Sequence, residues 1–128
     1  MAPKAKIMVV EDDLDEAKLI QMVLEGEGYE AVCAFNGIEA LEKLESDAPD
    51  LVVLDVMMPE MDGFEFCSEL RSSPENKDTP VVLLTGVAKH IHESKYPLDG
   101  VMRAEAQDYL EKPVKPEQLL ETIARLLQ

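Results

Sequence analysis

The sequence predicts an α/β fold in which a parallel sheet is covered by helices on both faces. Short runs of strand-forming residues alternate along the chain with segments whose apolar residues recur every three or four positions. Strands that alternate with helices are joined by right-handed crossovers and therefore run parallel. The strand-like runs are almost continuously apolar, as expected for strands that are buried on both faces. With 128 residues, the chain is predicted to form a single domain over residues 1–128.

Each element follows from a local pattern. The predicted strands are KIMVV (6–10), YEAVCAF (29–35), DLVVLD (50–55), PVVLLT (80–85) and QDYLEK (107–112). The first predicted helix has its apolar face at Leu14, Ala17, Ile20 and Leu24, and Gly26 and Gly28 close it. The later helices have apolar residues at Leu41 and Leu44, at Phe66, Cys67 and Leu70, and at Leu119, Leu120, Ile123, Leu126 and Leu127 after Pro116, which suits a first helical turn.

The helix expected before the fifth strand is the exception. Its stretch contains Pro97 and Gly100, which a helix interior tolerates poorly. We expect this element to be broken or shifted, with a shorter helix near residues 101–106. His90 and His92 lie in the same stretch, two positions apart, and do not share a helix face. Solvated surface residues are therefore favoured over a metal or pH-sensing site.

Composition excludes several classes of function. Twelve basic residues against 27 acidic ones give a net charge of -15, which repels nucleic acid and anionic lipid. No apolar run approaches the ~20 residues of a membrane span, and the first residues lack the features of a signal peptide. We expect a cytoplasmic protein with no nucleic-acid or membrane partner. Cys33 and Cys67 have no metal-ligand spacing and are predicted to be buried apolar residues.

Polar residues end four of the five predicted strands. They are Glu11, Asp12 and Asp13 after the first, Asp55 at the third, Thr85 at the fourth and Lys112 at the fifth. Ligand sites of such sheets lie beyond the carboxyl ends of the strands, so these side chains are expected to converge at one edge. Asp13 by itself is better explained as a helix N-cap. Solvated loops and caps do not account for the whole set.

The chemistry of this set indicates phosphoryl transfer. Neighbouring carboxylates raise each other's pKa unless a cation joins them, and hard oxygen ligands suit Mg²⁺. Lys112 provides a positive charge for Asp55 or for a phosphoryl oxygen, and Thr85 provides a hydroxyl donor. Carboxylate, metal, ammonium and hydroxyl groups together can position a phosphoryl group and neutralise its charge. Asp55 would be the nucleophile.

The sequence resembles the receiver domains of bacterial two-component response regulators, which include the single-domain chemotaxis regulator. The likeness rests on the acidic pair in VVEDD, on LDVMMPEMDGFEF, on LLTG and on DYLEKPVKP, in the family's order and approximate spacing. It covers nearly the whole chain. The resemblance implies the flavodoxin-like (βα)5 fold, a doubly wound parallel sheet of five strands in the order 2-1-3-4-5.

The resemblance also implies a role for each site residue. Asp55 would accept a phosphoryl group from the phosphohistidine of a histidine kinase or phosphotransfer protein. The ligands of Mg²⁺ would be Asp12, Asp55 and the backbone carbonyl of Met57, with Glu11 acting through water. Thr85 and Lys112 would bind phosphoryl oxygens, Thr85 and Tyr109 would be the switch pair, and the Lys112–Pro113 bond would be cis. From the residues alone, Tyr109 is equally consistent with a strand-end aromatic whose hydroxyl lies in water.

Two departures from the family pattern are visible. The segment between Thr85 and Lys112 is longer than usual, and Gly86 follows the switch threonine where alanine is more common. In the family, the side chains two positions after the acceptor and two after the switch threonine flank the water that hydrolyses the acyl phosphate. Here they are Met57 and Val87, which cannot hydrogen-bond a water, so slow self-dephosphorylation is expected.

The preferred interpretation is a phosphoaccepting receiver with no output domain, which signals by docking to a downstream protein. Its chemistry would be limited to self-catalysed phosphotransfer and dephosphorylation, so we do not expect an enzyme that acts on an external substrate. A phosphatase with an aspartate nucleophile is less favoured, because Met57 stands where its second carboxylate would be. The other alternative is a pseudo-receiver or constitutive interaction module. Such a protein has no need of Asp12, Asp55, Thr85 and Lys112 together.

Overall fold

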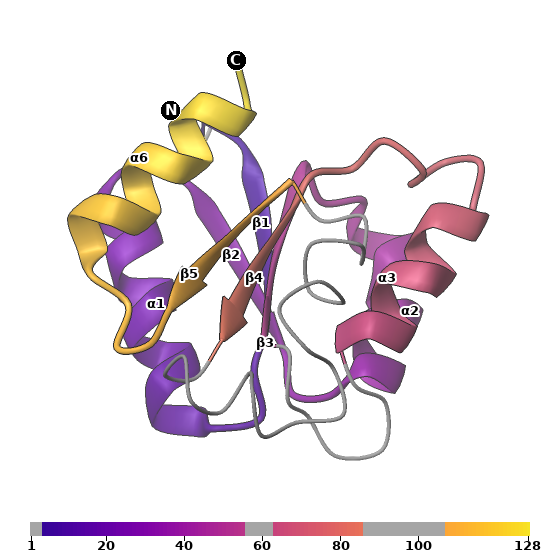
Figure 1. Ribbon diagram of the computed structural model, residues 1–128, viewed down its shortest axis with the longest axis horizontal. Helices are drawn as coiled ribbons and strands as arrows, with labels where there is room; N and C mark the ends of the chain where they lie inside the picture. The colour runs from indigo at the N-terminus through magenta and orange to yellow at the C-terminus, as the bar shows by residue number, and fades with distance from the viewer. Residues whose placement is uncertain (1–3, 56–62, 86–106) are drawn as a thin grey trace.

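The computed structural model describes residues 4–55, 63–85 and 107–128, and contains one parallel sheet (Figure 1). The strands are β1 (Lys6–Val10), β2 (Glu30–Ala34), β3 (Leu51–Asp55), β4 (Val81–Thr85) and β5 (Asp108–Glu111), and they are ordered β2-β1-β3-β4-β5. The described helices are α1 (Leu14–Gly26), α2 (Gly37–Asp47), α3 (Gly63–Ser72) and α6 (Pro116–Leu126). The α/β class, the parallel sheet and the strand order are confirmed.

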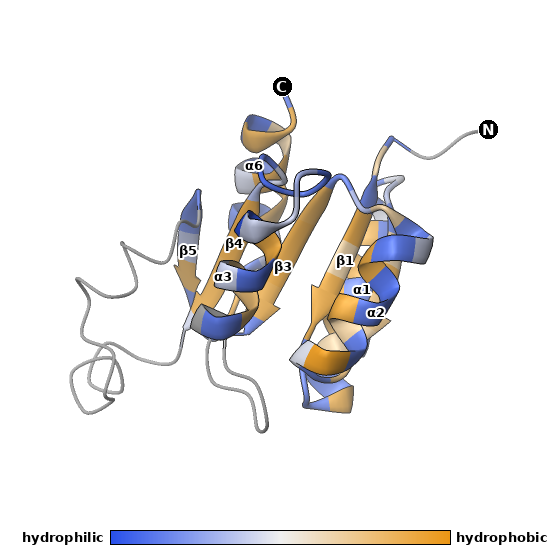
Figure 2. Ribbon diagram, turned by 90° about the vertical axis from the view of Figure 1, so that its right-hand side faces the viewer, coloured by the Kyte–Doolittle hydropathy of each residue, from blue (hydrophilic) through white to orange (hydrophobic). Residues whose placement is uncertain are grey.

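Helices cover both faces of the sheet. In Figure 1, α1 and α6 lie on one side of the strands, and α2 and α3 lie on the other. Successive strand residues point to opposite faces, so Val9 packs under α1 and α6 whereas Val10 packs under α2 and α3. Figure 2 shows that β1, β3 and β4 are largely hydrophobic, whereas the helices combine hydrophobic and hydrophilic residues. This double burial explains why the strand sequences are almost unbroken apolar runs.

The predicted strands agree with the observed ones to within one residue at either end. Two side-chain predictions need correction. Leu14 is 60% exposed, because it is the first residue of α1 and lies at the edge of the sheet rather than over it. Cys67 is buried as predicted, but Cys33 is only half-buried because β2 is an edge strand. The broken helix predicted after Thr85, together with His90 and His92, lies outside the described residues.

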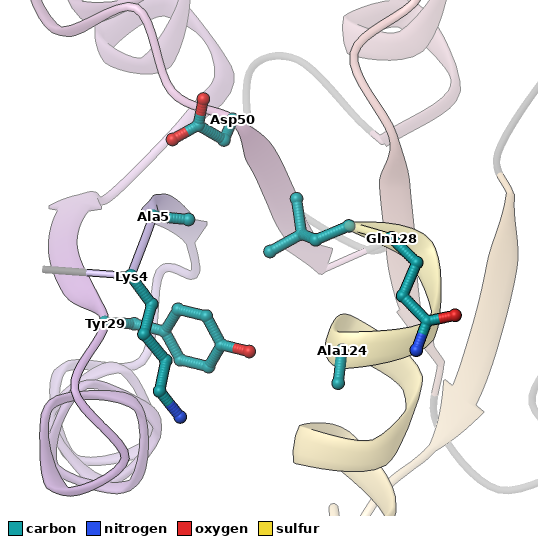
Figure 3. A pocket seen from close by; sticks show the side chains of 7 residues that line it. Lys4, Ala5, Tyr29, Asp50, Ala124 and Gln128 are labelled. Carbon is teal, nitrogen blue, oxygen red and sulfur yellow. The ribbon is translucent and has the colours of Figure 1, made fainter.

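None of the helices described here is long and apolar enough to cross a membrane. A hollow of about 360 Å³ lies at the edge of the sheet where the strands begin, beside the last turn of α6 (Figure 3). Its charged groups already have partners: Asp50 accepts a hydrogen bond from the backbone of Lys6 at 2.8 Å, and the Lys4 ammonium lies 3.7 Å from Glu27 and 5.5 Å from the centre of the Tyr29 ring. The cluster formed by Glu11, Asp12 and Asp55 lies at the opposite edge of the sheet.

Candidate functional site

The carboxyl edge of the sheet holds Asp55 as the last residue of β3, between the ends of β1 and β4. Glu11 and Lys112 each follow a strand by one residue. Their backbones extend the sheet, because Glu11 N–H donates to Ala34 C=O at 3.0 Å and Lys112 N–H donates to Thr85 C=O at 2.7 Å. These bonds fix the two residues as firmly as strand residues. Asp55, Glu11 and Lys112 therefore sit on rigid backbone.

Lys112 is the centre of the site's electrostatics. Its Nζ lies 3.4 Å from Asp55 Oδ2, 3.3 Å from Glu11 Oε1 and 3.3 Å from Glu16 Oε2. The Lys112 side chain is 22% exposed, whereas the Asp55 and Glu11 side chains are 8% and 1% exposed. One partly buried ammonium therefore faces three carboxyl groups. The structure brings the predicted lysine and the predicted nucleophile together, as the sequence indicated.

Three acidic residues form a possible metal site. Each of Glu11, Asp12 and Asp55 offers an oxygen, and these oxygens lie within 4.8 Å of one another. Glu11 and Asp55 are buried, while Asp12 is exposed and leaves the cluster open to water. Mg²⁺ prefers hard oxygen ligands and keeps several of its bound water molecules in protein sites. The residues present therefore fit this ion. Met57, the remaining predicted ligand, lies outside the described residues.

The crowding of carboxyl groups changes the acidity of Glu11. Burial and, to a smaller extent, the neighbouring Asp55 together raise the pKa of Glu11 from 4.5 to about 9, while Lys112 opposes the shift. Burial also lowers the pKa of Lys112, but the carboxylates of Asp55, Glu11 and Glu16 together outweigh it and leave that pKa raised. Lys112 is therefore a permanent cation at neutral pH.

Thr85 and Tyr109 lie on the other face of the sheet. Thr85 continues the alternation of Val81 and Leu83, which pack under α2 and α3, and Tyr109 packs partly buried against the same cluster. The Thr85 hydroxyl is buried and donates to the carbonyl oxygen of Leu110 at 3.4 Å, a long hydrogen bond. The two predicted switch residues thus share one face, and the hydroxyl of one touches the strand that carries the other.

Asp13 and Glu16, both at the start of α1, have different roles. Asp13 is the N-cap, because its Oδ1 accepts from the N–H groups of Asp15 and Glu16 at 3.0 and 3.1 Å. This confirms the cap predicted for Asp13. Glu16 was not predicted as a site residue, yet it contacts Lys112. The spacing of Asp13 and Glu16 is that of a capping box, which points to a role at the helix end, so no signal in the sequence links Glu16 to Lys112.

The backbone beside Lys112 matches a further prediction, since the Lys112–Pro113 peptide bond is cis. Of the seven residues predicted from the sequence for the site and the switch, the structure therefore places six at this edge of the sheet or directly beside it. Four of them, Glu11, Asp12, Asp55 and Lys112, form one cluster. Thr85 and Tyr109 lie beside this cluster, on the face of the sheet that α2 and α3 cover. The seventh predicted residue, Met57, lies outside the described residues.

Comparisons with known proteins agree with this arrangement. Residues 7–124 match the family model described as the response regulator receiver domain. The response regulator MprA of Mycobacterium ulcerans is 42% identical over 96% of this chain and 50% of its own length. The signal receiver domain of a signal transduction histidine kinase from Syntrophus aciditrophicus has a TM-score of 0.86 at 34% identity, over 96% of this chain and 89% of that one. The chemotaxis response regulator CheY4 of Vibrio cholerae has a TM-score of 0.84 at 32% identity, over 96% and 98% of the two chains. The chain thus spans about half the length of the MprA relatives that it matches.

Proposed function

The chain belongs to the response regulator receiver family, and on that premise we propose that Asp55 accepts a phosphoryl group from a histidine kinase or a phosphotransfer protein. One observation carries this proposal. A buried carboxylate at the end of β3 lies 3.4 Å from the ammonium of Lys112 and within 4.8 Å of two further acids. A site that only binds a protein has no need to bury these opposing charges.

The proposed reaction is a direct transfer. An Asp55 carboxylate oxygen forms a bond to phosphorus while the bond from phosphorus to the donor's imidazole nitrogen breaks, and the electrons of that bond remain on the imidazole. Lys112 neutralises charge on a phosphoryl oxygen, and the Thr85 hydroxyl donates to another. The chemistry ends with transfer to Asp55 and later hydrolysis. The protein is therefore proposed as a signalling component rather than an enzyme acting on an external substrate.

Mg²⁺ is the cofactor proposed for this site. Asp12 and Asp55 would bind it directly, Glu11 through water, and the Met57 carbonyl would complete the protein ligands. When bound, the ion reduces the repulsion between the carboxylates and the incoming phosphoryl group. The raised pKa of Glu11 is consistent with this assignment, because burial and the neighbouring Asp55 both disfavour the charged carboxylate and a bound cation would favour it.

The proposed signal is a rearrangement of Thr85 and Tyr109. To reach the phosphoryl group, the Thr85 hydroxyl has to leave the Leu110 carbonyl, and Tyr109 can then follow it from its partly buried position. We propose that a downstream protein reads this change near β5 and the unusual stretch between residues 89 and 100. The net charge of -15 is unfavourable for direct contact with nucleic acid or anionic membranes. Signalling of this kind fits a cytoplasmic location.

The proposal is tested by incubating the purified chain with acetyl phosphate and measuring its intact mass. With Mg²⁺, the wild-type protein should gain one phosphoryl group. The gain should disappear when EDTA replaces Mg²⁺ and in the Asp55→Asn variant. A variant that is phosphorylated to the same extent as the wild type would show that Asp55 is not the acceptor.

A further inference from the structure

The structure also assigns a positioning role to Glu16, and we propose that Glu16 restrains Lys112 in the unphosphorylated protein. In this view, Lys112 has to leave Glu16 before it can bind the phosphoryl group firmly. The inference rests on the proposed function of Asp55. It adds a residue of α1 that limits how readily the phosphorylated arrangement forms.

The ammonium group of Lys112 has a limited number of hydrogen-bond donors. An ammonium group has three N–H donors and no acceptor. In the structure, Lys112 Nζ faces carboxyl oxygens of three residues at 3.3 to 3.4 Å, namely Glu11, Asp55 and Glu16. Its hydrogen bonds go to Glu11 Oε1 at 3.3 Å, Glu11 Oε2 at 3.4 Å and Glu16 Oε2 at 3.3 Å, and Asp55 forms an ion pair with it, so these acids engage the whole ammonium group. A phosphoryl oxygen therefore gains a donor from Lys112 only when one of these contacts is given up.

Burial decides which contact is given up. The Glu16 side chain is 30% exposed, whereas those of Asp55 and Glu11 are 8% and 1% exposed. A buried carboxyl group that loses its hydrogen-bond donor remains poorly solvated whether it is charged or protonated, but an accessible one regains water. Asp55 moreover carries the phosphoryl group and stays beside Lys112. Glu16 is therefore the partner that Lys112 can release at least cost.

The backbone of Glu16 is anchored at the start of α1, close to Lys112. Glu16 lies in the first turn of α1, and its N–H donates to the Asp13 cap at 3.1 Å. The cap fixes the backbone of Glu16, so only its side chain could follow a movement of Lys112. The Glu16 carboxylate therefore stays within reach of the ammonium and competes for it, and removing this carboxylate should favour every state in which Lys112 binds a phosphoryl oxygen.

The test measures binding of fluoroberyllate, a phosphoryl mimic, to the Glu16→Gln variant. At saturating Mg²⁺ and fluoride, amide chemical shifts report the affinity. A partly exposed ion pair is weak, so we expect the variant to bind about two- to fivefold more tightly than the wild type. In the metal-free protein, the side-chain ¹³Cε signal of Lys112 should also shift in Glu16→Gln, since its ammonium loses a neighbour.

Asp15→Asn is the matched control. Asp15 is the preceding residue of the same turn, its N–H also donates to Asp13, and among the described residues it is not one of the acids that contact Lys112. The substitution removes one negative charge from the same place without touching the lysine. Fluoroberyllate affinity and the Lys112 signal should both stay at their wild-type values.

The outcomes separate this inference from the function on which it rests. A wild-type protein that binds no fluoroberyllate would overturn the proposed function, and this inference with it. If the wild type binds but Glu16→Gln binds equally or less tightly, the restraint alone is refuted. Equal tightening in Asp15→Asn would refute it too, since net charge would then explain the effect.

Discussion

Glu11 and Asp55 are neighbouring buried carboxyl groups, and the proton on Glu11 links the fold to pH. In the folded, metal-free protein the pKa of Glu11 is about 9, against 4.5 for the free side chain. At pH values between these two pKa values, Glu11 is more fully protonated in the folded state than in the unfolded state. The contribution of Glu11 to the free energy of unfolding therefore falls as pH rises through this interval.

This relation predicts the behaviour of Glu11→Gln. The variant keeps the shape of the neutral side chain and has no proton to lose. Its free energy of unfolding should therefore decline less than that of the wild type between about pH 5 and pH 9, the interval between the unfolded and folded pKa values of Glu11. Urea unfolding of both proteins in EDTA measures the difference. Wild-type and variant curves that stay parallel across this range would show that Glu11 ionises normally in the folded protein.

We propose that Met57 and Val87 influence a second property at the residue scale, the lifetime of the phosphorylated state. Neither side chain can orient an attacking water. Replacing them in the double variant Met57→Asn/Val87→Glu should accelerate loss of the phosphoryl group, because water-orienting or general-base assistance is typically worth ~10²-fold or more. The measurement is the decay of phosphorylated Asp55 in both proteins at equal Mg²⁺. Equal decay rates would assign the lifetime to other residues.

The sequence predicted the site residues that lie on strands, but not the one that lies on a helix. Asp55, Glu11 and Lys112 could be predicted because each directly follows or ends a strand, and parallel strands bring their carboxyl ends together. Glu16 could not, because it reaches the site from a helix. Which helical side chain meets Lys112 depends on how α1 packs over the sheet, and the sequence pattern does not specify this packing.

At the scale of elements, α1 depends on its cap. The Asp13 carboxylate accepts two backbone hydrogen bonds at the start of the helix. Asp13→Ala should lower the free energy of unfolding by about 1 kcal/mol, with an unchanged urea m-value. Asp13→Asn retains a capping oxygen and should lose much less. If both variants were equally destabilised, the charge of Asp13 rather than its hydrogen bonds would stabilise the helix.

The elements themselves were largely predictable. The three central strands β1, β3 and β4 are buried on both faces and are therefore apolar along almost their whole length, and all five predicted strands are accurate to one residue at either end. Periodicity failed where an element lies at an edge of the sheet. Leu14 begins a helix there and Cys33 belongs to the edge strand β2, so neither is buried as the pattern predicted. The spacing of apolar residues shows which face of an element a residue lies on, but not whether another element packs over that face.

At the scale of the whole molecule, Mg²⁺ should stabilise the fold. The chain has a net charge of -15, and its acids gather most closely around Asp55. An ion that binds only the folded state at ten times its Kd adds about 1.4 kcal/mol to the free energy of unfolding. The melting temperature should therefore rise with millimolar Mg²⁺ in the wild type, and clearly less in Asp55→Asn. An equal rise in both proteins would indicate general screening of charge.

The central claim is that Asp55 itself carries the phosphoryl group, and the most direct measurement locates the modified residue. Borohydride reduces an aspartyl phosphate to homoserine, which peptide sequencing by mass spectrometry can place in the chain. After treatment with acetyl phosphate and Mg²⁺, we expect homoserine at position 55 and nowhere else. Reduction at another acidic residue, or a phosphorylated protein with an unreduced Asp55, would contradict the account.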